Sequence, residues 1–317
     1  MNKLPKSTKE AILLRLSEGM SMRATAQIVK CSYNSVARLM YDAGRACATY
    51  HDTHVRGIQG KRFIECDYIW SFIYAKEKNV PTAIAAPEEA GHVWTWTAID
   101  SDSKLILAYL VSDKRGVEPA TIFMADLASR LEDDPELYTN GLQAYVPAVR
   151  TAFGAHVNYG QLVKGYGTRL PRSQQADPDK KHGSDRIKGF VKKRISGNPD
   201  MERLGTSYVE RSNLTMRMCM RRYTRFTNAF SKKIEAHVAM VHFYMTVFNW
   251  VRSHMTLSKG RNKVTPAMAA GLATEPMAMG ELVDIIEAAK PPPKKPGPKI
   301  GTVYRPRMAR ARRIAGN

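Results

Sequence analysis

The chain has 317 residues, of which 44% are hydrophobic, and 49 lysines and arginines against 29 aspartates and glutamates give a net charge of +20. This apolar content supports a sizeable core, so we expect a soluble globular protein with two or three domains. Because the cationic excess is large and spread over several segments, it favours a polyanionic partner, first of all nucleic acid.

Cysteine usage and hydropathy exclude several other classes of protein. The four cysteines form no C-x-x-C pair and have no histidine at ligand spacing, so neither a disulfide framework nor a zinc finger is predicted. The N-terminus lacks an apolar signal core, and no run approaches the ~20 apolar residues of a membrane span. We therefore expect a cytoplasmic protein with no membrane partner and no small-molecule cofactor.

The first fifty residues predict three short helices. The first ends near Gly19, the second begins at Ser21 as its N-cap, and the third covers 33–43 and ends at Gly44. A tight turn before the third helix is typical of a helix-turn-helix, whose last helix enters the major groove of DNA. A small helical bundle used only for packing is the alternative. The predicted DNA contacts are Tyr33, Asn34, Ser35 and Arg38.

A polar linker over 51–62 precedes a β-prone segment, 63–74, that contains Asp67. A carboxylate inside a strand that otherwise looks buried is either an edge residue facing solvent or a metal ligand. The free energy of burying a charge favours the metal ligand. Glu65 lies on the same face of this strand and is a weaker candidate, near the site or at the surface.

Two further strands, 93–99 and 104–111, form an antiparallel hairpin around a polar turn. A helix over 118–131 follows, with a proline suited to its first turn. The next short strand ends at Asn140, where Gly141 and a new helical period begin. The Asn140 side chain is therefore expected to point off the edge of the sheet.

A fifth short strand is predicted at 156–159, followed by a basic, glycine-rich insertion at about 160–200. We expect this insertion to contact DNA or to be mobile, with Lys192, Lys193 and Arg194 as contacts. Three antiparallel strands, a crossover helix and further strands form the order of an RNase H-like fold. The predicted class is therefore α/β (α+β), a mixed sheet with flanking helices, after an all-α helix-turn-helix domain.

Glu210 stands three residues after Ser207, which is the spacing of a capping box at a helix start. Glu210, Arg217 and Arg221 also share one helix face, which aligns an acid with two cations. Seven basic residues and no acid lie between Glu210 and Glu235, which favours a passing phosphate backbone over ordinary solvation. The predicted backbone contacts are Arg211, Arg217, Arg221, Arg222 and Arg225.

A long apolar helix over 234–250 and a C-terminal helix within 273–290 complete the globular part. The tail, 291–317, changes abruptly to proline, glycine, lysine and arginine, a composition typical of disorder without a partner. It is either an arm for the minor groove of DNA or a nonspecific polyanion tether. Its predicted contacts are Lys295, Lys299, Arg305 and Arg307.

Several ordered motifs give the chain a family resemblance. They are the Cys-Asp-Tyr-Ile-Trp-Ser segment around Asp67, the Asn-Gly-Leu-Gln-Ala-Tyr segment from Asn140, the Ser-Tyr-Val-Glu-Arg-Ser-Asn segment around Glu210, and two motifs over 249–254 and 265–271. Together they resemble bacterial insertion-sequence DDE transposases, most closely the insertion-sequence 1 type. The resemblance covers roughly 63–272.

The resemblance implies that Asp67, Asn140 and Glu210 occupy the three acidic positions that bind two Mg²⁺ or Mn²⁺ ions for phosphodiester cleavage and strand transfer. It implies double-stranded DNA partners, both terminal inverted repeats and target DNA, a homodimer or larger assembly, and a nucleoid-associated place in a bacterial cytoplasm. Asparagine in place of the second acid predicts an impaired enzyme. A nuclease-dead DNA-binding protein with a natural Asn140, such as a repressor or domesticated transposase, and a structure-specific nuclease are the alternatives.

Overall fold

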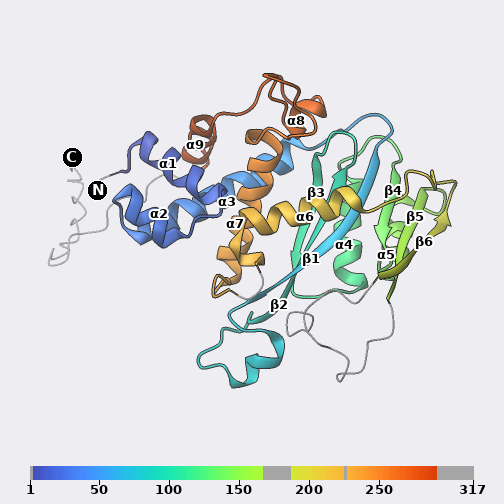
Figure 1. Ribbon diagram of the computed structural model, residues 1–317, viewed down its shortest axis with the longest axis horizontal. Helices are drawn as coiled ribbons and strands as arrows, with labels where there is room; N and C mark the ends of the chain where they lie inside the picture. Colours follow the sequence, from blue (N-terminus) through green and yellow to red (C-terminus); the bar gives the residue numbers. More distant parts are fainter. Residues whose placement is uncertain (1–2, 167–186, 225–226, 291–317) are drawn as a thin grey trace, which may run out of the picture.

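The computed structural model describes residues 3–166, 187–224 and 227–290, and it is built on one six-stranded mixed sheet (Figure 1). The strand order is β3-β2-β1-β4-β5-β6, with β1, β4 and β5 parallel and the other pairings antiparallel. This arrangement with flanking helices is RNase H-like, as the sequence predicts. The strands are β1 Phe63–Ile73, β2 Gly91–Asp100, β3 Ile106–Ser112, β4 Glu136–Asn140, β5 Asn158–Tyr166 and β6 Ile187–Ser196.

Helices cover both faces of the sheet and extend beyond one of its ends (Figure 1). The α-helices are α1 Lys6–Ser17, α2 Met22–Val29, α3 Tyr33–His54, α4 Val117–Ala128, α5 Tyr145–Phe153, α6 Ser207–Cys219, α7 Ile234–Thr246, α8 Pro266–Ala269 and α9 Met279–Ala288. Two 3-10 turns, η1 Glu77–Thr82 and η4 Arg221–Tyr223, and a π-helical turn, η5 Val247–Val251, complete the described elements. No helix in the described residues is long and apolar enough to span a membrane.

Alternation along β1 separates two hydrophobic cores, because successive side chains of a strand point to opposite faces of the sheet. Ile64 and Cys66 belong to the core under α4 and α5. Ile69, on the opposite face, belongs to the core that α6 and α7 cover. Asp67 shares that second face with Glu65 and Ile69, so its carboxylate lies beneath α6.

The first three helices share a core with the rest of the chain. Ile12 of α1 and Val36 of α3 are fully buried in the cluster that also contains Phe243 of α7 and Ile286 of α9. The helix expected to end at Gly44 continues to His54, so the first residues of the expected linker are helical instead. The helix does not end there because Gly44 is a packing residue: a Cβ added to it would lie 2.5 Å from Cα of Ala239 in α7.

This close approach of α3 to α7 predicts that Gly44→Ala destabilises the protein. The added methyl group overpacks the helix contact, and this outweighs the better helix propensity of alanine, for a net loss of about 1–2 kcal/mol. Urea unfolding measures the difference. Gly189→Ala is the matched control, because a Cβ there meets no atom within 4 Å; equal effects of the two substitutions would contradict the packing role.

Strands form at both ends of the basic insertion, whose middle part, 167–186, lies outside the described residues. β5 continues to Tyr166 and pairs with β6, which the sequence does not predict as a strand. β6 carries three consecutive basic residues and is exposed along the sheet edge, so it lacks the alternation of a half-buried strand. The tail over 291–317 lies outside the described residues.

A buried histidine ties α7 to η4. The two ring nitrogens of His237 lie 2.9 Å from the Tyr223 hydroxyl and 3.0 Å from the Ser231 hydroxyl. Burial, with a contribution from the nearby Arg222 guanidinium, lowers the pKa of His237 to about 3. His237 is therefore neutral in the folded protein and protonated below about pH 6.5 in the unfolded chain.

Because the unfolded state binds this proton first, acidification from about pH 6.5 towards pH 3 removes stability. The loss from this one group is about 2 kcal/mol at pH 5. We expect His237→Asn to be less stable than the parent at pH 7.5 but to lose less on going to pH 5, as measured by urea unfolding at both values. His156→Asn, at an exposed histidine, is the control; an unchanged pH dependence in His237→Asn would refute the assignment.

Candidate functional site

Parallel pairing of β1 with β4 brings Asp67 and Asn140 together. The last residues in register are Cys66 and Thr139, so Asp67 and Asn140 follow one position further along the two strands. The Asn140 amide nitrogen donates to Oδ1 of Asp67 at 2.5 Å. Its own Oδ1 accepts from the backbone N–H of Leu142 at 3.0 Å, in a short turn that begins the connection to α5.

The second oxygen of Asp67 is also hydrogen-bonded. Nδ2 of Asn213, on α6, donates to Asp67 Oδ2 at 3.1 Å. Burial raises the pKa of Asp67 to about 6; the hydrogen bond from Asn140 opposes this shift and the negative charge of Glu210 adds to it. Both oxygens of the central carboxylate thus accept from amide groups, one from β4 and one from α6.

Glu210 lies in the first turn of α6 and faces the same site. Its Oε1 forms an ion pair with Nζ of Lys164 on β5 at 2.5 Å and accepts from the Thr206 hydroxyl at 2.7 Å. The capping box suggested by the spacing from Ser207 is not present: the N-cap is Thr206, and its side chain bonds to the Glu210 carboxylate. The Glu210 side chain therefore contacts Lys164 and the Thr206 hydroxyl instead of returning to the backbone of its own helix.

Glu65 holds the beginning of α6 against β1. It is 2% exposed, and its Oε2 accepts from the backbone N–H groups of Tyr208 and Val209 at 2.8 and 3.0 Å. A carboxylate at a helix N-terminus satisfies free backbone donors and interacts favourably with the helix dipole. Burial nevertheless raises the pKa of Glu65. Of the two positions predicted for Glu65, near the site or at the surface, the surface position is wrong.

This cap predicts that Glu65→Ala loosens the turn that carries Glu210. Two buried backbone donors lose their acceptor, which costs about 1–3 kcal/mol, and Glu65→Gln, which keeps one carbonyl oxygen, costs less. Amide hydrogen exchange should show faster exchange at Tyr208 and Val209 in Glu65→Ala. Glu202→Ala, outside the cap, should leave those amides unchanged, whereas unchanged protection in Glu65→Ala would contradict the capping role.

The side chains present do not fit a two-metal centre in this arrangement. Asp67 faces N–H donors at both oxygens, and the oxygen of Asn140 already accepts from the backbone. The ammonium of Lys164 lies beside Glu210. The described residues contain no group of three or more His, Cys, Asp or Glu side chains that could hold a metal ion. Asp67 and Asn140 are in contact, but both Asp67 oxygens accept from amide groups and Glu210 is paired with Lys164.

Two residues that bond to the site, Asn213 and Lys164, are not among the site residues predicted from the sequence. Asn213 is one turn after Glu210, and this spacing places both on the same face of α6, so helical periodicity could have identified it. Lys164 has no such signal. It reaches Glu210 through the pairing of β5 with β4, and that pairing joins segments that the sequence does not connect.

The residues predicted to contact DNA lie on several different elements of the structure. Tyr33, Asn34 and Arg38 are exposed at the start of α3, where the Ser35 backbone N–H bonds to the N-cap side chain of Ser32. The remaining predicted contacts in the described residues fall on α6 and η4 (Arg211, Arg217, Arg221 and Arg222) and on β6 (Lys192, Lys193 and Arg194). Arg225 and the four predicted contacts of the tail lie outside the described residues.

Two of these cations have partners within the protein. Arg222 donates to the Ser231 hydroxyl at 2.7 Å, and burial lowers its pKa, which favours a structural role. Nζ of Lys192 donates to the carbonyls of Met201 and Glu202 at 2.6 and 3.0 Å. Arg211 and Arg221 are exposed, so they are better placed to contact a phosphate backbone.

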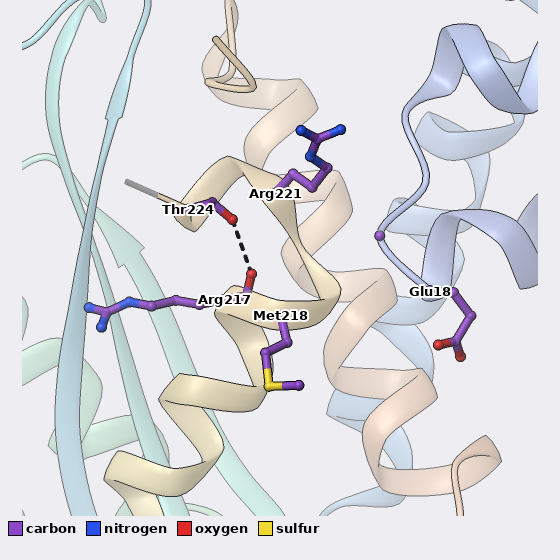
Figure 2. A pocket seen from close by; sticks show the side chains of 6 residues that line it. Glu18, Arg217, Met218, Arg221 and Thr224 are labelled. Atoms are coloured by element: carbon purple, nitrogen blue, oxygen red, sulfur yellow. Dashed lines mark hydrogen bonds between the residues drawn. The ribbon is translucent and has the colours of Figure 1, made fainter. Parts of the chain in front are cut away.

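A pocket of about 690 Å³ opens between the end of α1 and the end of α6. Figure 2 shows Met218 and Arg221 on its α6 side, Glu18 opposite, and the Arg217 side chain directed away towards the sheet. Asp67, Asn140 and Glu210 are not among the residues that line this pocket.

Comparison with known proteins adds little to these observations. No family model matches the chain, and no curated protein matches it. Among solved structures, it overlaps with a Mos1 transposase paired-end complex with left transposon end, at 12% identity and a TM-score of 0.19 over 48% of this chain and 58% of that one. The overlap with the Mos1 strand transfer complex has 11% identity and a TM-score of 0.20 over 78% and 79%.

A Mos1 mariner paired-end complex with Mn also overlaps, at 13% identity and a TM-score of 0.19, over 48% of this chain and 59% of that one. The chain thus spans less than two thirds of the length of both paired-end complexes. Overlaps with TM-scores this low carry no argument about activity. The fold class rests on the strand order and pairing described above.

Proposed function

We propose that the chain is a DDE-type DNA transposase of an insertion sequence, close to the insertion-sequence 1 type, whose cleavage and strand transfer are impaired by Asn140. The supporting observation is that Asp67 of β1 and Asn140 of β4 are hydrogen-bonded to each other beneath α6, the helix that carries Glu210 in its first turn. These are the three positions of the motifs that resemble the acids of that family. A site assembled from three distant segments is difficult to explain as a packing feature alone.

The partners follow from charge and geometry. A net charge of +20 favours double-stranded DNA, both terminal inverted repeats and target. The exposed start of α3 would enter a major groove, and Arg211 and Arg221 would contact phosphates. Because two element ends must be joined, the active form is a homodimer or larger assembly. The proposed location is a bacterial cytoplasm, in association with the nucleoid.

The chain's own residues account for the proposed impairment. Divalent cations would activate water and a DNA 3′ hydroxyl in an enzyme with three acids. In this chain both oxygens of Asp67 already accept hydrogen bonds from the amides of Asn140 and Asn213, and Glu210 is paired with the ammonium of Lys164. We therefore expect the chain to bind DNA without efficient cleavage.

The second candidate function is a nuclease-dead DNA-binding protein in which Asn140 is the natural residue. The observation that favours it is the fit of the Asn140 amide, which donates to Asp67 and accepts from Leu142 at the same time. An amide placed this way satisfies a buried carboxylate without a cation. In this case the site contributes to stability rather than to chemistry.

Asn140→Asp separates the two functions. The substitution removes the amide donor and places a second carboxylate against Asp67, so the variant should be less stable in EDTA and regain stability with Mn²⁺ or Mg²⁺. For an impaired transposase we expect at least tenfold more metal-dependent cleavage of duplexes that carry the DNA flanking its gene. Thermal unfolding and gel assays measure the two effects.

Asn198→Asp, at an exposed asparagine, is the control for the added charge. Metal-dependent stability without cleavage would support the nuclease-dead protein. If the unchanged chain cleaves as well as Asn140→Asp, the role assigned to this position is wrong. An unlabelled target duplex in the same assay reveals joined products, which a nuclease without strand transfer would not form.

A further inference from the structure

A second groove, of about 390 Å³, lies between the end of α3, the π-helical turn, the segment after α8, and α9. These elements lie side by side at one end of the molecule (Figure 1). Asp67, Asn140 and Glu210 are not among its lining residues, and the proposed transposase function assigns it no role. It is lined by Tyr50, Trp250, Leu272, Ala273, Thr274, Glu275, Met277, Glu281, Asp284 and Ile285.

The floor of the groove is aromatic. The rings of Tyr50 and Trp250 meet edge to face at 5.2 Å, and His54 stacks on Tyr50 at 3.9 Å. Trp250 is 3% exposed, so it forms the floor of the groove. The backbone N–H of Met277 donates to the Trp250 carbonyl at 2.9 Å and fixes the wall formed after α8.

The rim of the groove is acidic, although the chain as a whole is strongly cationic. Asp284 forms an ion pair with Lys6 at 2.6 Å. Glu281 accepts from the backbone N–H of Ala278 at 2.7 Å, and neither it nor Glu275 forms an ion pair with a described residue. In the described part of the chain, two carboxylates at the mouth of an aromatic groove thus form no direct ion pair, although Lys6 interacts electrostatically with Glu281.

This combination suits one kind of ligand. Aromatic-lined grooves bind proline-rich segments in the polyproline II conformation, because such segments lose little entropy when they bind. Carboxylates beside the aromatic floor add attraction for lysine or arginine near the prolines. The ligand expected from these contacts is a proline-rich segment with adjacent positive charge.

The chain contains such a segment next to the groove. Residues 291–299 read Pro-Pro-Pro-Lys-Lys-Pro-Gly-Pro-Lys and include a P-x-x-P spacing from Pro293 to Pro296. The segment begins directly after Lys290, and α9, which supplies Glu281 and Asp284, ends at Ala288.

The distances allow the tail to return to its own helix. From Ile285 to Ala288 is about 5 Å along α9. A polyproline II segment advances ~3.1 Å per residue, so Lys294 and Lys295 can reach about 12–16 Å from Lys290. Tethering also gives the segment an effective concentration on the order of millimolar at the groove.

We propose that the groove formed by Tyr50, Trp250 and the carboxylates of Glu275 and Glu281 binds the chain's own proline- and lysine-rich segment, 291–299, in cis. The bound prolines lie on the aromatic floor, and the lysines face the acidic rim. Lys295 and Lys299, otherwise candidates for DNA contact, are held against the protein in this state. The proposal requires neither DNA nor catalysis, so it stands or falls independently of the proposed function.

Photo-cross-linking in the full-length chain tests the proposal. The photoreactive residue p-benzoylphenylalanine replaces Ile300, directly after the segment, and mass spectrometry identifies its cross-linked partners without DNA present. We expect cross-links to 272–285 and to the end of α3. Glu275→Lys combined with Glu281→Gln, which keeps an acceptor for Ala278, should lower the yield at least fivefold, and Pro293→Ala with Pro296→Ala should lower it similarly.

Glu89→Lys, a charge reversal at an exposed site outside the groove, should leave the yield unchanged. Thermal unfolding of every variant shows whether the fold is retained. Cross-links that avoid 272–285, or a yield insensitive to the Glu275 and Glu281 changes in a folded protein, would overturn the proposal. Mixing unlabelled and ¹⁵N-labelled chains identifies the source of the segment; mixed-isotope cross-links would assign the groove to a second copy and refute binding in cis.

Discussion

The hydrogen bond between Asn140 and Asp67 sets the arrangement of the site. A carboxylate on a sheet face beneath a helix costs substantial free energy unless its charge is balanced or its oxygens are hydrogen-bonded. In this chain the two oxygens of Asp67 accept hydrogen bonds from one amide of β4 and another of α6, at 2.5 and 3.1 Å. The same contacts join two neighbouring strands to the helix above them. The residue type at position 140 therefore also affects how α6 packs on the sheet.

Other polar groups connect the layers in the same way. Glu65 fixes the N-terminus of α6 to β1. At the other end of α6, the Arg252 guanidinium donates to Sγ of Cys219 and to the Ser17 carbonyl, and it forms an ion pair with Glu18 at 2.6 Å. α6 is therefore held at one end by the sheet and at the other by the first helix. This dual attachment places the N-terminal helices in a fixed relation to Asp67.

The sequence predicts much of the fold because burial leaves a periodic pattern. β1 to β4 and α4 to α7 follow apolar periods, and their expected order gives the RNase H-like sheet. β6 is missed because an exposed edge strand with consecutive lysines has no apolar face. The end expected at Gly44 is wrong because a glycine in a helix also permits close packing, and the partner Ala239 is nearly two hundred residues away.

The same distinction between local and distant information applies to the residues of the site. Asp67, Asn140 and Glu210 are recognisable from their local settings, and the structure brings all three positions to one edge of the sheet. Their hydrogen-bond and ion-pair partners include Lys164 and Asn213, which only the pairing of β5 and the orientation of α6 bring near. Residue types therefore indicate where a cation site belongs, whereas the surrounding nitrogen donors determine whether its oxygens are already occupied by the protein.

Charge is also unevenly distributed over the described surface. Exposed cations gather at the start of α3, along α6 and on β6, whereas Glu275, Glu281 and Asp284 surround the groove beside α9. In a chain with a net charge of +20, an acidic rim repels a polyanion and attracts the chain's own basic segments. A groove with this charge is thus unsuited to DNA, and it lies beside α9, the helix that leads into the proline- and lysine-rich tail.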